Sequence, residues 1–206
     1  MTQVRPYAGV DAADRLSRRR SRLLEAGLEI LGSNIDPTEL TVRGICQQAG
    51  LATRYFYESF ADKEDYIGAV FDSVIARLAT TTQAAVATAP VEEQTRAGLA
   101  NIVRTIEADR RVGRLMFGAQ VSNATVIRKR QESAALFVLL SGQHVETLTR
   151  RPADERTKAF AHFVVGGVTQ AISAWLAGDV ALSPAELVDE LSAIVDAFGK
   201  SGLVRD

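Results

Sequence analysis

The sequence has little of several residue types on which particular functions depend. Cys46 is its only cysteine, which excludes an intrachain disulfide and a metal cluster built on cysteines. There are two histidines, His144 and His162, and neither has a glutamate three residues before it, so a di-iron helical bundle is not expected. The chain also has no glycine-rich phosphate loop and no nucleophile elbow. We therefore expect no enzymatic activity, no cofactor and no bound metal.

Long hydrophobic runs are also missing. No apolar stretch approaches the ~20 residues that a membrane-spanning helix needs, and residues 1–15 lack the apolar segment of a secretory signal. We expect a cytoplasmic protein with no membrane partner.

The charges nearly cancel: 24 Lys and Arg stand against 25 Asp and Glu, which gives a net charge of -1. Overall basicity therefore provides no argument for nucleic-acid binding. The charges are unevenly placed, however, because five arginines fall within eight positions near the N-terminus: Arg15, Arg18, Arg19, Arg20 and Arg22. Such a run is equally consistent with a solvated helix face. It therefore indicates DNA binding only if a second DNA-binding feature lies next to it.

The remaining composition and the periodicity indicate an all-α protein. With 206 residues, 47% of them apolar, the chain can form one large helical domain or a small domain joined to a larger one. Apolar residues recur at spacings of three and four, and no alternating strand pattern or hairpin signal is convincing. We expect about nine helices. They cover residues 11–32, 42–49, 53–59, 62–87, 90–109, 112–120, 124–150, 152 or 154–177, and a last segment from residue 184.

Several helix ends carry specific signals. Thr41 is suited to cap the helix that Gly50 ends, since glycine tolerates the positive φ of such a turn. Asp62 is suited to cap the next long helix, with Asp65 reaching back to the residues before it. The run Ser183–Glu186 places a cap, a proline at the first helical position and a glutamate at the third.

Four Phe and Tyr side chains fall within six positions after the Gly50 turn. Phe56 and Phe60 lie four residues apart, on one helix face, and are expected to anchor in the core. Tyr55 and Tyr57 then lie on other faces, because neighbouring residues on a helix point in different directions. Two short helices joined by a glycine turn form a helix-turn-helix, whose second helix presents its N-terminal half to the DNA major groove.

The stretch 41–64 resembles the DNA-binding domain of the tetracycline-repressor (TetR) family of bacterial transcriptional regulators. The family pattern is present as Thr41, Ala49-Gly50-Leu51, Phe56-Tyr57, Phe60 and Lys63-Glu64, and the preceding helical residues 22–31 also fit. The resemblance is highly specific and covers a quarter to a third of the chain. It implies a DNA-binding domain over residues 11–63 and a ligand-binding and dimerisation domain over 64–206, after a flexible tail that Pro6 and Gly9 predict for residues 1–10.

By this resemblance, Tyr57 and Lys63 contact DNA phosphates, and Lys63 is helped by the dipole of the helix that it opens. The chain departs from the family at Ala52, often a capping serine, so Thr53 is expected to cap and to read bases less freely. It also departs at Arg54, often glycine, which either bonds a guanine or takes a phosphate. The full set of expected DNA contacts is Arg19, Arg20, Thr41, Arg43, Thr53, Arg54, Tyr55, Tyr57 and Lys63.

About 140 residues follow the DNA-binding part, more than dimerisation alone requires, which favours an effector pocket. Its lining is expected to be bulky and mostly apolar, although the same residues are also consistent with plain core or interface. The candidates are Phe71, Asn101, Met116, Phe117, Gln120, Phe137, Leu140, His144 and Trp175. A lining with so few hydrogen-bonding groups favours an uncharged or weakly polar organic molecule. Bound beside Phe71, it would swing the DNA-binding unit through the helix 62–87.

The last two helices carry apolar stripes that predict a two-fold, four-helix dimer interface. The expected interface residues are Phe160, Phe163, Val164, Gly167, Val168, Ala171, Leu187, Leu191, Ile194 and Phe198. Taken together, the sequence predicts a homodimeric repressor that binds a near-palindromic operator and is released by a small-molecule effector. A DNA-binding dimer without an effector and a helical protein-interaction adaptor stay open as alternatives.

Overall fold

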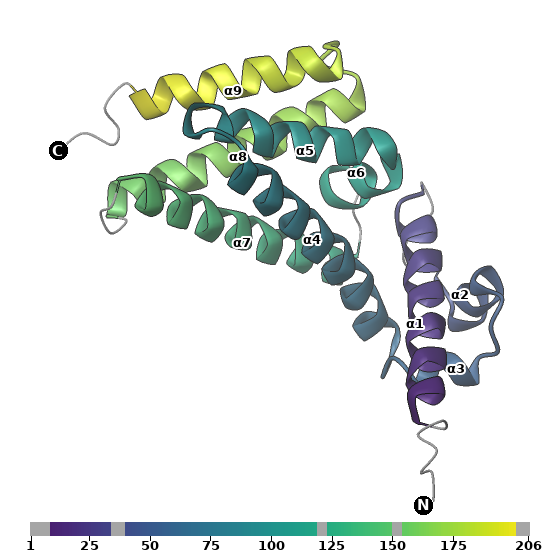
Figure 1. The fold of residues 1–206 in the computed structure, drawn as a ribbon. Coiled ribbons are helices and arrows are strands. Elements are labelled where there is room, and N and C mark those ends of the chain that lie inside the picture. The colour runs from purple at the N-terminus through teal and green to yellow at the C-terminus, as the bar shows by residue number, and fades with distance from the viewer. Residues whose placement is uncertain (1–8, 34–39, 119–122, 150–153, 201–206) are drawn as a thin grey trace, which may run out of the picture.

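The computed structural model describes residues 9–33, 40–118, 123–149 and 154–200. Within these ranges the chain forms nine α-helices and one 3₁₀ turn, with no strand (Figure 1). The all-α prediction is confirmed. The elements are α1 (Gly9–Leu31), α2 (Val42–Ala49), α3 (Arg54–Tyr57), α4 (Lys63–Thr88), η2 (Val91–Glu93), α5 (Gln94–Ala108), α6 (Arg110–Phe117), α7 (Ala124–Thr149), α8 (Glu155–Ala177) and α9 (Pro184–Lys200).

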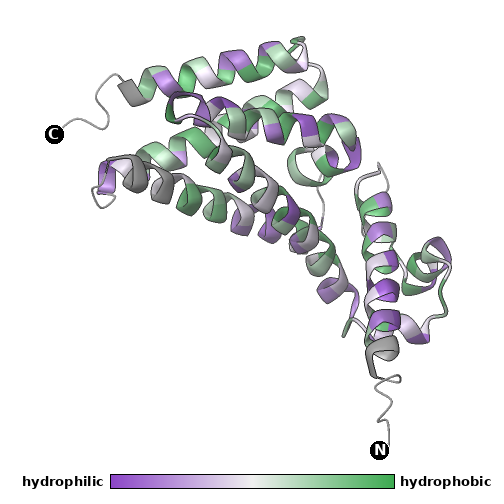
Figure 2. Cartoon of the chain, viewed as in Figure 1, coloured by the Kyte–Doolittle hydropathy of each residue, from purple (hydrophilic) through white to green (hydrophobic). Residues whose placement is uncertain are grey.

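The helices form a small unit and a larger one, with α4 running between them. Helices α1, α2 and α3 lie together at one end, and α4 runs from this unit into the group formed by α5 to α9 (Figure 1). Polar and apolar residues alternate along α1, whereas apolar residues dominate α8 (Figure 2). Because α4 belongs to both groups, a displacement of one end of this helix is carried to the other.

The predicted end signals of α2 and α4 are present. The Thr41 hydroxyl accepts a hydrogen bond from the backbone N–H three residues on, at 3.1 Å, and Gly50 ends α2 with a φ of 62°. The Asp62 carboxylate accepts from the N–H of Asp65 at 2.7 Å, and the Asp65 carboxylate accepts from the N–H of Ala61 at 3.0 Å. These local bonds fix where the helix-turn-helix meets α4.

Several boundaries differ from the prediction. Helix α1 begins at Gly9, two residues before the predicted start, so residues 9 and 10 do not belong to the predicted tail. Helix α3 is a single turn, although the N–H of Phe60 still bonds the Phe56 carbonyl at 2.9 Å and continues the helical path. Pro90 precedes the 3₁₀ turn rather than opening a helix. Helix α6 begins two residues before the predicted start, at Arg110, because the Asp109 carboxylate caps it by accepting from the N–H of Arg111 at 3.0 Å.

The core of the small unit closes around aromatic rings from α3 and α4. Phe56 and Tyr66 have no exposed surface, and the buried Tyr66 hydroxyl donates to the backbone carbonyl of Leu23 on α1 at 2.7 Å. Helices α1 and α4 approach closely at Gly27, where a Cβ would lie 2.6 Å from the Tyr66 hydroxyl oxygen and would also meet Val70. Gly27 therefore sets the separation of the two helices.

A second core joins α5, α8 and α9 in the larger unit. Leu187 and Leu191 of α9 belong to it, with 2% and 7% of their surface exposed. Both are predicted to lie in the dimer interface. For Leu187 this prediction is wrong, whereas Leu191 also borders the groove between α8 and α9. Helix α9 turns them inward against α5, so they stabilise the protomer itself.

Candidate functional site

The two short helices have the predicted inward and outward faces. Ile45 and Ala49 of α2 are buried, and so are Phe56 and Phe60, whose ring centroids lie 5.4 Å apart. Tyr57 points the other way, with 61% of its surface exposed, and packs edge-on against Phe56 at 5.3 Å. A rigid buried ring thus supports an exposed tyrosine next to it.

The other outward positions also keep polar groups accessible. Thr41, Arg43 and Arg54 are exposed, and Lys63 is half-buried at the first position of α4. The Asp62 carboxylate already bonds the N–H of Asp65, so a phosphate next to Lys63 would meet the N–H groups of Lys63 and Glu64 at the start of α4. The sequence-predicted contacts on α2, α3 and the start of α4 therefore belong to one small unit.

Two guanidinium groups lie close to the Tyr55 ring. The centre of the Arg19 guanidinium lies 4.0 Å from the Tyr55 ring centroid and that of Arg54 lies at 4.7 Å. The Arg54 Nη2 group also donates to the Tyr55 hydroxyl at 2.7 Å. This hydrogen bond lowers the pKa of Tyr55 and raises that of Arg54. The Arg54 and Tyr55 side chains, both predicted to lie in the DNA groove, are thus bonded to each other within the protein.

Arg19 and Arg20 have partners within the protein. Arg19 forms an ion pair with Glu58 at 3.2 Å. Arg20 donates to the Ser59 carbonyl at 2.8 Å and lies 4.5 Å from the Phe60 ring centroid. Both side chains therefore fasten α1 to the segment around α3, a role that the charge run does not reveal. Their predicted contact with DNA stays a prediction.

Thr53 does not cap α3, contrary to the expectation from Ala52. Its backbone is helical, with φ −54° and ψ −31°, and its side chain makes no capping bond. The pKa of the Cys46 thiol is raised by burial and lowered in part by the nearby Thr53 side chain. Thr53 is exposed at the N-terminus of α3.

The larger unit contains a cavity of about 390 Å³, within the ~300–1,000 Å³ that is usual for small-molecule sites. Three of the predicted effector residues, Met116, Phe117 and Phe137, lie in its wall. The described lining comes from α4, α5, α6, α7 and α8: Leu78, Leu99, Ile102, Met116, Phe117, Gly118, Arg130, Ser133, Ala134, Phe137, Ser141, Val164, Val165, Val168, Thr169, Gln170, Ile172 and Ser173. A mostly apolar ligand of modest size fits this wall.

Four predicted effector residues lie elsewhere. Phe71 is fully packed in the core, so α4 meets the cavity through Leu78 instead. The Asn101 side chain donates to two threonine hydroxyls of α4 at 3.0 Å, which stabilises the α4–α5 contact. Trp175 donates through Nε1 to the Leu182 carbonyl at 2.9 Å. Leu140 is half-buried and is not among the lining residues. Two more predictions, Gln120 and the His144 side chain, lie outside the part of the chain that the structure describes.

Arg130 of α7 is a cavity residue that the sequence does not predict. Its guanidinium donates to backbone carbonyls of Arg114 at 3.0 Å, of Leu115 at 2.8 and 3.0 Å, and of Gly118 at 2.6 Å. These carbonyls belong to the end of α6. Burial lowers the pKa of Arg130 to about 10. No local pattern marks this residue, because its partners lie 12 to 16 positions away in the sequence.

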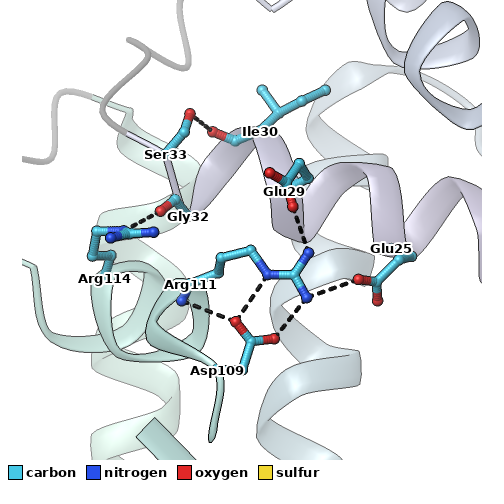
Figure 3. Close-up of polar contacts among 8 residues, drawn as sticks. All are labelled: Glu25, Glu29, Ile30, Gly32, Ser33, Asp109, Arg111 and Arg114. Atoms are coloured by element: carbon cyan, nitrogen blue, oxygen red, sulfur yellow. Dashed lines mark hydrogen bonds and ion pairs between the residues drawn. The ribbon is translucent and has the colours of Figure 1, made fainter. Parts of the chain in front are cut away.

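A cluster of charges joins α6 to α1 (Figure 3). The Arg111 guanidinium forms ion pairs with Glu25 at 2.9 Å and Glu29 at 2.5 Å, both on α1, and with Asp109 at 2.8 Å. The hydrogen bond with Asp109 is the main cause that raises the pKa of Arg111, and the same bond lowers the pKa of Asp109. Arg111 and Asp109 are therefore both charged at neutral pH.

The end of α1 is held by a second contact with α6. Arg114 donates through Nε to the backbone carbonyl of Gly32 (Figure 3). A Cβ on Gly32 would lie 2.6 Å from the Arg111 Cβ, so only glycine allows α6 to approach this closely. The helix that lines the cavity with Met116 and Phe117 thus also holds the first helix of the small unit.

An exposed apolar face lies on α8 and α9. Phe163 is 58% exposed, Ile194 48% and Phe198 37%, and the rings of Phe163 and Phe198 pack edge-to-face at 5.4 Å. A groove of about 180 Å³ runs between the two helices, and Gly167 lies in its wall. The other predicted interface residues in this wall are Val164, Val168, Ala171 and the largely buried Leu191, whereas Phe160 is half-buried outside it.

Helix α8 is long and apolar enough to cross a membrane by length and composition, although the sequence shows no uninterrupted apolar run of that length. It is the only such helix in the described ranges, and 11% of its apolar window is buried. One such helix is weak evidence for a membrane span, since a helix that buries its apolar face against a partner passes the same test. Among the residues that the structure describes, no group of three or more His, Cys, Asp or Glu could hold a metal ion.

The comparisons with known proteins identify the fold. No family model matches the sequence, and no curated protein matches it. The structure is similar to the fatty acid degradation regulator FadR from Bacillus halodurans, with a TM-score of 0.71 and 17% identity over 86% of this chain and 94% of that one. It is also similar to FadR from Bacillus subtilis in complex with stearoyl-CoA, with a TM-score of 0.69 and 14% identity over 85% and 96% of the two chains.

A third similar structure, from Syntrophomonas wolfei, is described as a TetR-family transcriptional regulator. The TM-score is 0.72 and the identity 13%, over 91% of this chain and 97% of that one. The protein therefore has the TetR-family fold along nearly its whole length, as the resemblance of residues 41–64 implies. At identities this low the likeness establishes the fold, and function has to be argued from the site.

Proposed function

We propose that this protein is a TetR-family transcriptional regulator that binds DNA as a homodimer and is controlled by a small, mostly apolar effector. One observation carries the proposal: α4 begins next to the helix-turn-helix with its exposed Tyr57 and reaches the cavity of about 390 Å³ at Leu78. Residues 11–63 then form the DNA-binding domain, and residues 64–206 bind the effector and dimerise. Such a regulator works in the cytoplasm.

The outward groups of the helix-turn-helix divide into two roles. Tyr57 and Lys63 bind phosphates, which sets the position of α3 in the groove without reading sequence. Thr53 and the Arg54–Tyr55 pair are placed to meet base edges. Because the Arg54 guanidinium is already ordered against Tyr55 at 2.7 Å, little side-chain entropy is lost when it binds.

The exposed face of α8 and α9 is the dimer interface in this account. Exposed Phe163, Ile194 and Phe198 are costly to leave in water, and a second copy would cover the same face on both subunits. Nothing lies within 4 Å of a Cβ built on Gly167, so the approaching helix can come close there. A two-fold dimer presents two copies of α3 to successive turns of a near-palindromic operator.

The route from cavity to DNA runs through α4 and α6. Leu78 of α4 and Met116 of α6 both line the cavity. Helix α4 leads directly to Lys63, and α6 holds α1 through Arg111. An effector that binds one arrangement of these helices more tightly shifts the population away from the DNA-binding form. We infer that the protein is a repressor and that effector binding releases it from its DNA operator.

The test is a binding selection. The full chain is mixed with a library of random duplexes, and bound DNA is sequenced. We expect near-palindromic sites with half-sites about one helical turn apart, or somewhat more. Affinity for the selected duplex is then measured against a panel of hydrophobic metabolites and drugs. Phe117→Ala and Phe137→Ala should weaken the response to any active compound, whereas Leu139→Ala, exposed on α7 and outside the cavity wall, should not.

The outcomes separate the alternatives. Operator binding without any active compound would favour a DNA-binding dimer that has no effector. Failure to select any duplex would favour a helical protein-interaction adaptor, which does not need Tyr57 and Lys63 in register.

A further inference from the structure

Arg130 has an unusual position among the charged residues of the cavity region. It is the only charged side chain in the described cavity lining, and that lining contains no carboxylate. Its neighbour Lys129 bonds Asp72 at 2.8 Å, and Arg111 has three carboxylate partners. The charge of Arg130 is therefore left without an anionic partner within the described chain, in a wall that is otherwise apolar or neutral.

The hydrogen bonds of Arg130 are made with neutral carbonyls alone. Its four bonds to Arg114, Leu115 and Gly118 occupy four of the five N–H donors of the guanidinium, and one Nη1 donor remains. The helix dipole of α6 contributes only a partial negative charge at this end. Arg130 is half-buried, and burial lowers its pKa to about 10, so the partly desolvated cation stays charged at neutral pH.

We propose that Arg130 receives the anionic head group of the effector, so that the effector is an amphipathic anion with an apolar body. The proposal rests on the proposed function and specifies the ligand of the same cavity. A carboxylate or phosphate oxygen matches the fork of a guanidinium, and a charge-assisted bond in a low-dielectric wall is stronger than a neutral one. The apolar body lies against Leu78, Ile102, Phe117 and Phe137. The ligand is thus mostly apolar, as the wall requires, but carries one charged group, unlike the uncharged or weakly polar molecule that the sequence favours.

The same residue couples binding to release. The Arg130 guanidinium donates to carbonyls at the C-terminal end of α6, whereas Arg111 and Arg114 of α6 bond residues of α1 and its C-terminal end. An anion that draws the guanidinium toward the cavity takes donors from the α6 carbonyls, so the end of α6 is freed to shift. Helix α6 then carries the displacement to α1 and from there to the helix-turn-helix. Recognition of the charge and loss of DNA affinity are, in this account, one event.

The first experiment varies the ligand and leaves the protein unchanged. Isothermal titration calorimetry on the full chain compares straight-chain carboxylates of eight to fourteen carbons and aryl-alkyl carboxylates with their methyl esters, each below its micelle-forming concentration. We expect the acids to bind about tenfold or more tightly than the esters, since a hydrogen bond to a charged group is lost. A matched series of alkyl phosphates then shows whether Arg130 prefers a carboxylate or a phosphate head group.

Two results would overturn the proposal. One is equal binding of acids, phosphates and esters, and the other is binding of none of the anions. Either result is distinguishable from failure of the proposed function, because DNA binding is measured separately. If esters release the protein from its operator as well as acids do, the anionic effector is refuted but the regulatory function is supported. If the protein binds no duplex, the regulatory function is refuted, whatever the cavity binds.

The second experiment varies the protein. Arg130→Gln keeps a donor for the α6 carbonyls and removes the charge, so it should reduce acid binding to the level of the ester and leave ester binding unchanged. Arg130→Lys should retain part of the preference for the acid. Arg128→Gln is the control, since Arg128 is an exposed arginine on the same helix that pairs with Glu132. The proposal would be contradicted if Arg128→Gln lost the preference for acids over esters, or if Arg130→Gln kept it in full. Either result would assign the preference to the general surface charge.

Discussion

Replacing Gly27 with alanine should destabilise the protein, although alanine is the better helix former. Two effects oppose each other. Removing a glycine from a helix interior gains ~1 kcal/mol. The added methyl group, however, meets Val70 and lies 2.6 Å from the Tyr66 hydroxyl oxygen, and overpacking of this kind costs ~1–3 kcal/mol.

The clash also threatens the buried bond from Tyr66 to the Leu23 carbonyl, at 2.7 Å. Leaving its donor and acceptor unsatisfied costs a further ~1–3 kcal/mol. If the clash takes a middle value and half of this bond is lost, the net loss is about 2 kcal/mol, or a Tm lower by roughly 4–8 °C for a chain of this size. Affinity for the operator should fall as well, since α1 carries the helix-turn-helix and α4 carries Lys63.

The assay is thermal unfolding at a fixed protomer concentration, because dimerisation makes Tm depend on concentration. Gly142→Ala is the matched control: nothing lies within 4 Å of a Cβ built there, so the gain of helix propensity should raise the stability. The double variant Gly27→Ala with Val70→Ala should lose less than the sum of the single losses, since the new methyl group fills part of the space vacated. Additive losses, or a Gly27→Ala protein as stable as the wild type, would refute the close α1–α4 contact.

Further changes test the junction, the dimer and the DNA contacts. Arg111→Met should cost roughly 1 kcal/mol at neutral pH, a modest loss because its α1 partners are more than half exposed. The lowered pKa of Asp109 means that its stabilisation is present at neutral pH and is lost on acidification. The stabilities of the two proteins in chemical unfolding should therefore begin to converge below a pH of about 4 and meet below the lowered pKa. Gly167→Glu should give monomers in sedimentation, and a surviving dimer would place the interface elsewhere. Tyr57→Phe should weaken binding to all duplexes by similar factors, whereas Arg54→Ala should change the preference at particular base pairs by roughly tenfold if it reads a guanine. Equal losses on specific and random duplexes for Arg54→Ala would make it a phosphate contact.

The parts of the fold that could be predicted are those with local causes. The cap at Thr41, the turn at Gly50 and the capping pair at Asp62 each depend on residues within four positions, so the bounds of α2 and the start of α4 follow from the sequence. Phe56 and Phe60 were assignable to the core because a spacing of four places them on one face.

The parts that could not be predicted depend on distant partners. Periodicity shows that Leu187 is apolar and faces inward, but it does not distinguish α5 of the same chain from a second copy. It likewise does not distinguish Phe71, packed in the core, from Phe117, beside a cavity. Arg111 meets Glu29 across 82 positions and Arg130 meets backbone carbonyls, which carry no sequence signal at all.

The most direct test of the account is the salt dependence of DNA binding. Fluorescence anisotropy would measure the affinity of the wild type and of Lys63→Ala for the selected near-palindromic duplex and for a scrambled one. The account predicts two chains per selected duplex, weaker binding to the scrambled duplex, and an affinity that falls steeply with salt, with a slope smaller by about one unit in Lys63→Ala. Equal affinity for both duplexes, or a slope that Lys63→Ala leaves unchanged, would contradict the placement of α3 and the start of α4 on DNA.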